Sequence, residues 1–209
     1  MNYKIEILNA CIYKFLKEDF SENSEILYQE TQLRFSEMSK DTKVIHQSKN
    51  PIDKRIELAA FFLALMKTMD AAGMSYATIR EFCLKVVTEL VRPKSQWESF
   101  KRKLPAKLIK TWIGGILISI IQHKAKFRHP DGFSVNIVTY KMDTYQLGFG
   151  IDILECGICK LYHKHQFDEY AKILCEVDEM TSMMAGLQLV RKGTIANGAH
   201  KCDFRFQPL

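Results

Sequence analysis

The fold class is decided by residues 129–140, which read His129-Pro130-Asp131-Gly132-Phe133-Ser134-Val135-Asn136-Ile137-Val138-Thr139-Tyr140. The first four of these residues have the composition of a turn. The next eight are rich in β-branched residues and partly alternate between apolar and polar, which predicts a strand. Before this stretch, apolar residues recur at helical spacing, and after it alternation and short turns prevail. The sequence therefore predicts a helical first part and a second part that contains a sheet.

Four helices are expected before the basic middle of the chain, over residues 5–20, 24–38, 51–72 and 76–91. Asn50-Pro51 has the composition of a helix start, because proline at the first helical position loses no hydrogen bond. Ser75 is the expected cap of the fourth helix. The polar residues 39–50 predict a loop between the second and third helices.

Residues 95–121 predict one or two further helices, with a break at Pro105. An apolar run, residues 111–121, is interrupted by Gly114-Gly115 and is too short to cross a bilayer. Beside it stand five basic residues: Lys101, Arg102, Lys103, Lys107 and Lys110. We interpret them as the solvated rim of a buried apolar run, with a phosphate- or membrane-facing patch as the alternative.

The last third predicts a small antiparallel sheet with a packed helix. Its expected strands cover residues 133–140, 145–154, 187–196 and 202–206, and its helix covers residues 161–184. For residues 145–154, which contain Gly148 and Gly150, a strand that leads into a helix is the alternative. Asn197-Gly198 is a strong turn signal between the last two strands. We therefore predict an α+β fold and one domain over residues 1–209, mainly helical over residues 1–128 and sheet plus helix over residues 133–209.

Composition supports a globular protein without a nucleic-acid partner. Hydrophobic residues make up 47% of the 209, enough for a substantial core. A net charge of +6 is modest and is more typical of solubility than of nucleic-acid binding. The first residues lack a charged segment followed by an apolar one, so we expect no signal peptide and a cytoplasmic protein. Its six cysteines should then stay reduced.

Four cysteines fall in the last third, namely Cys156, Cys159, Cys175 and Cys202. A thiolate can attack an electrophilic carbon or bind a soft metal. The spacing Cys156-x-x-Cys159 occurs in redox and zinc sites, but the other possible ligands are scattered along the chain. We therefore expect no cofactor, and leave a metal site or a structural role as alternatives for this pair.

Two local patterns place acidic and basic groups beside these thiols. Cys175 and Asp178 are three residues apart, so they share one face of the expected helix. In residues 202–206, Cys202 lies on one face of the expected strand, and Asp203 and Arg205 lie on the other. An exposed Asp203–Arg205 pair and a polar pocket lined by both remain open as interpretations. In the second interpretation, the Asp203/Arg205 face and the Cys175/Asp178 face are the walls of one pocket.

The order of residues from Cys156 to Phe206 resembles that of the L-2-amino-thiazoline-4-carboxylic acid hydrolase family. The matching positions are Cys156, Leu174-Cys175, Asp178, Arg191, Thr194, Gly198-Ala199 and Cys202-Asp203-Phe204-Arg205-Phe206. The resemblance is close over about 50 residues and loose over the helical part.

The resemblance implies a hydrolase that opens a cyclic amidine. Water adds to C2 of 2-amino-thiazoline-4-carboxylate, or a thiolate attacks it, and a carbamoyl-cysteine results. On this basis Cys156, Cys175 and Cys202 are candidate nucleophiles. Asp178 and Asp203 are candidate bases that also pair with the amidinium.

For the rest of the substrate, the resemblance implies that Arg205 holds the carboxylate and that Thr194 donates a hydrogen bond. The expected partner is a small molecule, with neither nucleic acid nor membrane, and the sequence predicts no oligomeric state. The alternative function is a non-catalytic domain that binds a small ligand or metal, or senses redox state, through its C-terminal cysteines. A membrane-surface or nucleic-acid-binding module that uses residues 101–110 is a third possibility.

Overall fold

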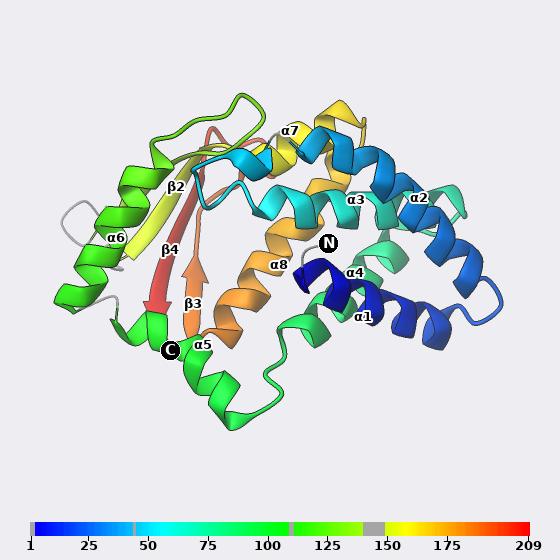
Figure 1. Cartoon of the computed structure of the whole chain (residues 1–209), viewed down its shortest axis with the longest axis horizontal. Coiled ribbons are helices and arrows are strands. Elements are labelled where there is room, and N and C mark those ends of the chain that lie inside the picture. The colour runs from blue at the N-terminus through cyan, green and yellow to red at the C-terminus, as the bar shows by residue number, and fades with distance from the viewer. Residues whose placement is uncertain (1–2, 44, 109–110, 140–148) are drawn as a thin grey trace.

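The computed structural model describes residues 3–43, 45–108, 111–139 and 149–209 (Figure 1). Within these ranges most helices precede residue 129, and all strands follow it. The fold is therefore α+β, with a helical first part and an antiparallel sheet in the second, as the sequence predicted.

The first part is built around one central helix, α3 (Arg55–Ala71). It packs along α2 (Ser24–Thr42) and contacts α4 (Tyr76–Val91), while α1 (Tyr3–Asp19) packs on α2 and α4. Because neighbours surround it, α3 buries almost every residue from Ala59 to Met69. Its apolar character on several sides is thus explained by its central place.

The ends of these helices differ in part from the prediction. Ser75 caps α4 as expected, since its side chain accepts a hydrogen bond from Thr78 N at 3.2 Å. However, α3 begins after Lys54 and not at Pro51, and α2 continues through residues 39–42, where a loop was predicted. The side-chain oxygen of Asn50 does accept a hydrogen bond from Ile52 N at 3.1 Å, and its amide donates to the carbonyl of Phe133 at 3.1 Å. Residues 51–54 nevertheless form turns, because their backbone bonds, such as Asp53 N to Asn50 O at 3.2 Å, join residues three apart.

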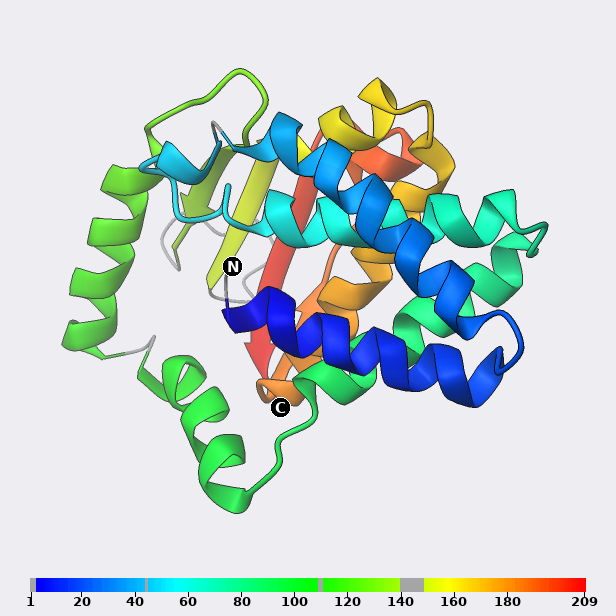
Figure 2. The same cartoon turned by 45° about the vertical axis from the view of Figure 1, so that its right-hand side comes forward.

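Two helices form a separate pair beside the sheet, α5 (Gln96–Leu108) and α6 (Trp112–Ala125). The predicted break at Pro105 is wrong, because α5 continues through it. The carbonyl of Lys101, which proline leaves without its helical donor, lies on an exposed part of the helix where water can bind it. Figure 2 shows the pair projecting from the rest of the protein. None of the helices in the described ranges has both the length and the apolar content needed to cross a bilayer.

The sheet has the strand order β1-β2-β4-β3 and every neighbouring pair is antiparallel. Its strands are β1 (Ser134–Val138), β2 (Phe149–Glu155), β3 (Leu187–Val190) and β4 (Cys202–Pro208). Although β4 is the last strand in the sequence, it lies between β2 and β3 in the sheet, so the C-terminal stretch is a central strand. The part of the predicted second strand at residues 145–148 lies outside the described residues, and β3 is shorter than predicted.

Two helices connect β2 to β3, where the sequence predicted one. These are α7 (Gly157–Lys164) and α8 (Ala171–Met184). The chain breaks between them at Gln166, whose φ of 55° ends α7, and the ring of Phe167 then stacks on that of Tyr170. In Figure 1 the sheet stands between α6 and α8, so its two faces meet different helices. A continuous core of buried side chains links the first part, as at Ile56 and Phe61, to the sheet, as at Ile153 and Phe204.

Candidate functional site

Four free cysteines meet around one small pocket between the sheet, α7, α8 and the start of α3. We call it the thiol pocket. Its lining consists of Arg55, Phe133, Ile153, Cys156, Ile158, Cys159, Ala171, Leu174, Cys175, Asp178, Cys202 and Phe204. The enclosed volume is about 20 Å³, which is room for about one water molecule. Apart from the thiols, its charged groups are the side chains of Arg55, which is half exposed, and Asp178.

Cys156 occupies the N-cap of α7, where its sulfur accepts a hydrogen bond from the backbone N–H of Cys159 at 3.5 Å. The thiol of Cys159 also hydrogen-bonds to it and is the largest cause that lowers the pKa of Cys156. The same contact, together with burial, raises the pKa of Cys159. Because donors at a helix N-terminus stabilise negative charge, Cys156 is the cysteine best placed to be a thiolate.

The other two thiols of the pocket behave differently. Burial raises the pKa of Cys175 to about 11 and that of Cys202 to about 12. A hydrogen bond from Ile195 N to the Cys202 sulfur, 3.2 Å long, opposes this rise without reversing it. Both side chains are therefore protonated near neutral pH, and they suit donation of a hydrogen bond better than nucleophilic attack.

Arg55 and Asp178 form an ion pair beside these thiols. Asp178 is largely buried, with 16% of its side chain exposed, whereas the Arg55 side chain is 47% exposed. The carboxylate raises the pKa of Arg55. Sequence reasoning missed Arg55, because it lies in the helical part, 123 positions before Asp178, and no local pattern distinguishes it from a solvated arginine.

Thr194 has its hydroxyl near the Cys175 thiol and is 2% exposed. Its hydroxyl is close enough to lower the pKa of Cys175. Among the described residues, however, this hydroxyl has no hydrogen-bond partner of normal length. The loop holds Thr194 in place, since its carbonyl accepts from Asn197 N at 3.0 Å and from Ala199 N at 3.1 Å. A buried hydroxyl in this state is a candidate donor to a bound ligand.

Arg191 fastens α8 to the sheet next to the thiol pocket. It donates to the backbone carbonyl of Cys175 at 3.1 Å and to Glu179 at 2.7 Å, and its guanidinium lies 5.4 Å from the centre of the Phe204 ring. The residue therefore positions Cys175 without lining the pocket itself. This explains its place in the pattern of residues from Cys156 to Phe206.

Asp203 and Arg205 lie on the opposite face of β4 and do not reach the thiol pocket. Asp203 accepts from the backbone N–H groups of Lys192 and Gly193, each at 3.0 Å. Arg205 donates to Asp152 at 2.8 Å. The interpretation that these two residues share a pocket with Cys175 and Asp178 is therefore corrected, because strand alternation separates them by the thickness of the sheet.

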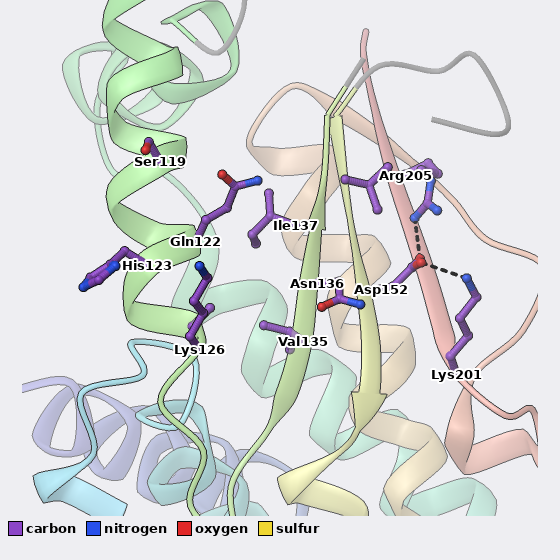
Figure 3. A pocket seen from close by; sticks show the side chains of 12 residues that line it. Ser119, Gln122, His123, Lys126, Val135, Asn136, Ile137, Asp152, Lys201 and Arg205 are labelled. Atoms are coloured by element: carbon purple, nitrogen blue, oxygen red, sulfur yellow. Dashed lines mark hydrogen bonds and ion pairs between the residues drawn. The ribbon is translucent and has the colours of Figure 1, made fainter. Parts of the chain in front are cut away.

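On that opposite face, a second and larger cavity separates the sheet from α6 (Figure 3). We call it the α6 groove, and its volume is about 650 Å³. At its sheet side Asp152 accepts from both Arg205 and Lys201, the latter at 2.7 Å. Gly150 lies under Arg205, and a Cβ there would come within 2.6 Å of the arginine side chain. The glycine thus makes room for the buried guanidinium.

A third cavity adjoins the thiol pocket and shares Cys159 and Ala171 with it. Its volume is about 330 Å³, and its rim carries Lys160, His163 and Asp168. No three histidine, cysteine or acidic side chains in the described part of the chain are placed to hold one metal ion, although Cys156 and Cys159 are neighbours.

Comparisons with known proteins point to one family. A family model described as L-2-amino-thiazoline-4-carboxylic acid hydrolase matches residues 53–206 of the 209. The matched range contains every residue of the thiol pocket, Arg55 included. It also extends about 100 residues further toward the N-terminus than the stretch from Cys156 to Phe206. No curated protein and no solved structure gave a match.

Proposed function

Because the chain belongs to the L-2-amino-thiazoline-4-carboxylic acid hydrolase family, we propose that it hydrolyses a small cyclic amidine at the thiol pocket. The observation that supports this most is the position of Cys156, a thiol with a lowered pKa in the same pocket as the Arg55–Asp178 pair. The proposed nucleophile is Cys156. Cys175 and Cys202, with raised pKa values, line the pocket as neutral thiols.

The charges of the pocket suit a zwitterion. A thiazoline carboxylate carries an amidinium at one end and a carboxylate at the other. Asp178 can pair with the amidinium and Arg55 with the carboxylate. Without substrate the two residues pair with each other. Substrate binding then exchanges one ion pair for two, so neither charge is left without a counter-charge.

Entry requires the pair to separate, because the pocket has room for only about one water molecule while Arg55 binds Asp178. Arg55 is half exposed and sits at the start of α3, so its long side chain can swing outward without moving the backbone. Binding and opening are thus coupled through one arginine.

The proposed reaction begins when the Cys156 thiolate attacks C2 of the ring. The C2–S bond of the ring breaks, and the released sulfur takes a proton. In the resulting intermediate C2 is bonded to the Cys156 sulfur and to both amidine nitrogens. Water then attacks C2, with Asp178 accepting its proton, and the Cys156 thiolate leaves. One water is consumed, its oxygen becomes the carbamoyl oxygen, and the product is a carbamoyl-cysteine. Thr194 is proposed to donate a hydrogen bond to the substrate.

The test is incubation of the purified protein with L-2-amino-thiazoline-4-carboxylate and detection of carbamoyl-cysteine by mass spectrometry. We expect turnover by the wild type and by Cys11→Ala, whose thiol lies in the helical part, but not by Cys156→Ala. Iodoacetamide should label Cys156 before the other cysteines. Turnover that survives in Cys156→Ala would remove the thiolate mechanism, and no turnover by the wild type would remove this substrate.

One observation favours a second function, redox sensing. Cys159 hydrogen-bonds to Cys156 one helical turn away, so the two sulfurs are near neighbours. Hydrogen peroxide can oxidise the Cys156 thiolate to a sulfenic acid, and attack by Cys159 then gives a disulfide and water. A loss of two mass units after peroxide treatment, restored by dithiothreitol and absent in Cys159→Ser, is the expected result. Irreversible oxidation without a disulfide would exclude this function.

A further inference from the structure

The α5–α6 pair carries most of the large apolar side chains that the structure leaves in contact with water. Fifteen such side chains are exposed in the described ranges, and nine of them fall between residues 97 and 127. We call these nine the α5–α6 surface: Trp97, Phe100, Leu104, Trp112, Ile116, Leu117, Ile120, Ile121 and Phe127. The sequence predicted that the apolar run of α6 would be buried, and this prediction is wrong.

On α6 several large apolar side chains face water, which is unusual for a helix on the surface of a globular protein. Ser119, Gln122 and Lys126 line the α6 groove, and Gln122 points toward the sheet in Figure 3. Ile116 and Ile120, by contrast, are 51% and 47% exposed. A surface helix of a globular protein normally turns its apolar stripe inward and its polar side chains outward. The outer stripe of α6 therefore lacks the apolar environment that its composition calls for.

Charge is concentrated on the same segment. Residues 93–128 contain nine of the 30 lysines and arginines but one of the 24 acidic residues. This segment therefore carries a net charge of +8, and the rest of the chain sums to −2. Basic and aromatic groups also touch each other there, since the ammonium of Lys101 lies 5.2 Å from the centre of the Trp97 ring. The modest +6 of the whole protein thus conceals one strongly basic, apolar region.

We propose that the α5–α6 surface docks on an anionic phospholipid bilayer, with α6 lying in the plane of the interface. Exposed tryptophan and aliphatic side chains enter the boundary between headgroups and acyl chains, while the lysines bind the lipid phosphates. This docking does not depend on the reaction proposed above. With 14 residues, α6 is too short to cross the bilayer and lies along it.

Other partners fit these features less well. A second copy of the chain would bring two segments of charge +8 together, and their repulsion opposes self-association. Nucleic acid would accept the lysines but offers no apolar surface for Ile116, Leu117, Ile120 and Ile121. An anionic bilayer supplies both the negative charge and the apolar phase.

The chain offers a direct optical test, because both of its tryptophans, Trp97 and Trp112, lie on the α5–α6 surface. The full-length protein is mixed with vesicles of phosphatidylcholine alone or of phosphatidylcholine and phosphatidylglycerol at equal amounts, at low and high salt. We expect flotation with the anionic vesicles and a blue shift of tryptophan emission, both weakened by salt. Neutral vesicles should bind much less.

Two pairs of matched variants separate charge from apolar contact. Lys101→Glu with Lys107→Glu should weaken binding to anionic vesicles by at least about tenfold. The control, Lys40→Glu with Lys43→Glu at the C-terminal end of α2, makes the same change of net charge and should not weaken binding. Likewise Ile116→Ser with Ile120→Ser should weaken binding, but Ile26→Ser with Leu33→Ser should not. All four remove exposed groups, so each is expected to fold, and circular dichroism checks this.

The proposal is overturned if the wild type fails to float with anionic vesicles at low salt. It is also overturned if the α5–α6 variants bind like their matched controls. A third outcome against it is self-association, seen by light scattering, that buries the tryptophans without vesicles and is lost in Ile116→Ser with Ile120→Ser.

Discussion

Asp178 on α8 and Arg55 at the start of α3 pair with each other across 123 positions of the chain. The pair joins the helical part to the segment that carries the thiols, and it keeps the thiol pocket at about 20 Å³. One residue supplies a carboxylate beside Cys156, and the other supplies a half-exposed cation. The pair is therefore central to how a charged substrate would enter.

Substitution of either partner should affect substrate binding and catalysis differently. Arg55→Gln removes the proposed carboxylate contact, so KM should rise about 10- to 100-fold while kcat changes little. Asp178→Asn removes the proposed base as well as the amidinium contact, so kcat should also fall. Steady-state kinetics with the thiazoline carboxylate measures both. The control is Glu176→Gln: Glu176 lies on α8, like Asp178, but pairs with Arg80 of α4, so its loss should leave both constants unchanged.

The pH profile should depend on Cys159. Its thiol lowers the pKa of Cys156, so the thiolate persists to lower pH than in an ordinary cysteine. In Cys159→Ala the donor is lost, the pKa of Cys156 rises, and the acid limb of kcat/KM against pH should move to higher pH. Activity near neutral pH should then fall and recover in alkali. Cys159→Ser keeps a donor and should shift the limb less; equal profiles for all three proteins would contradict the proposed role.

Thr194 should contribute to activity more than to stability. Its buried hydroxyl makes no normal hydrogen bond in the described part of the structure, so Thr194→Val should change the free energy of unfolding by less than about 1 kcal/mol. Loss of a hydrogen bond to substrate should lower kcat/KM about tenfold. Thr194→Ser retains the hydroxyl and should keep most of the activity. Urea unfolding and initial rates give the two quantities, and a large loss of stability in Thr194→Val would mean a structural role.

Asp203 should contribute to stability more than to activity. Its carboxylate accepts from two backbone N–H groups, those of Lys192 and Gly193, on the face away from the thiol pocket. Asp203→Ala should therefore lower the free energy of unfolding by about 2–3 kcal/mol, measured by urea, while the folded fraction keeps its kcat. Asp203→Asn still has an acceptor oxygen and should lose less than half as much. A fall in kcat without a loss of stability would return Asp203 to the catalytic candidates.

Patterns confined to a few residues were read correctly from the sequence. Ser75 caps its helix, Cys175 and Asp178 line the same pocket from one helical face, and alternation along β4 separates Cys202 from Asp203. Each follows from the period of a single element, which the local sequence carries in full. The turn at Asn197-Gly198 belongs here too, since Gly198 takes the left-handed conformation with φ of 83°.

Errors arose at the ends of helices and where packing decides which side of a helix is buried. Asn50 binds Ile52 N as a helix cap would, but residues 51–54 form turns and the α-helix begins only at Arg55. The predicted helix over residues 161–184 is interrupted at Gln166, whose φ is 55°. The apolar run of α6 looks like core, but Ile116 and Ile120 are exposed and the polar Gln122 lines the groove beside the sheet. The pattern of apolar and polar residues defines the two sides of a helix, but it does not decide which side packs against the rest of the protein.

The sequence by itself determined the α+β class, the family and the set of cysteines and acidic residues that could do chemistry. Tertiary structure alone decided which of them meet. It brought Arg55 to Asp178, gathered Cys156 and Cys159 with Cys175 and Cys202 around one pocket, and left Asp203 and Arg205 outside that pocket. The physical reason is that hydrogen bonding and side-chain period act over a few residues, whereas a pocket forms where distant elements pack, and packing depends on every face of the fold at once.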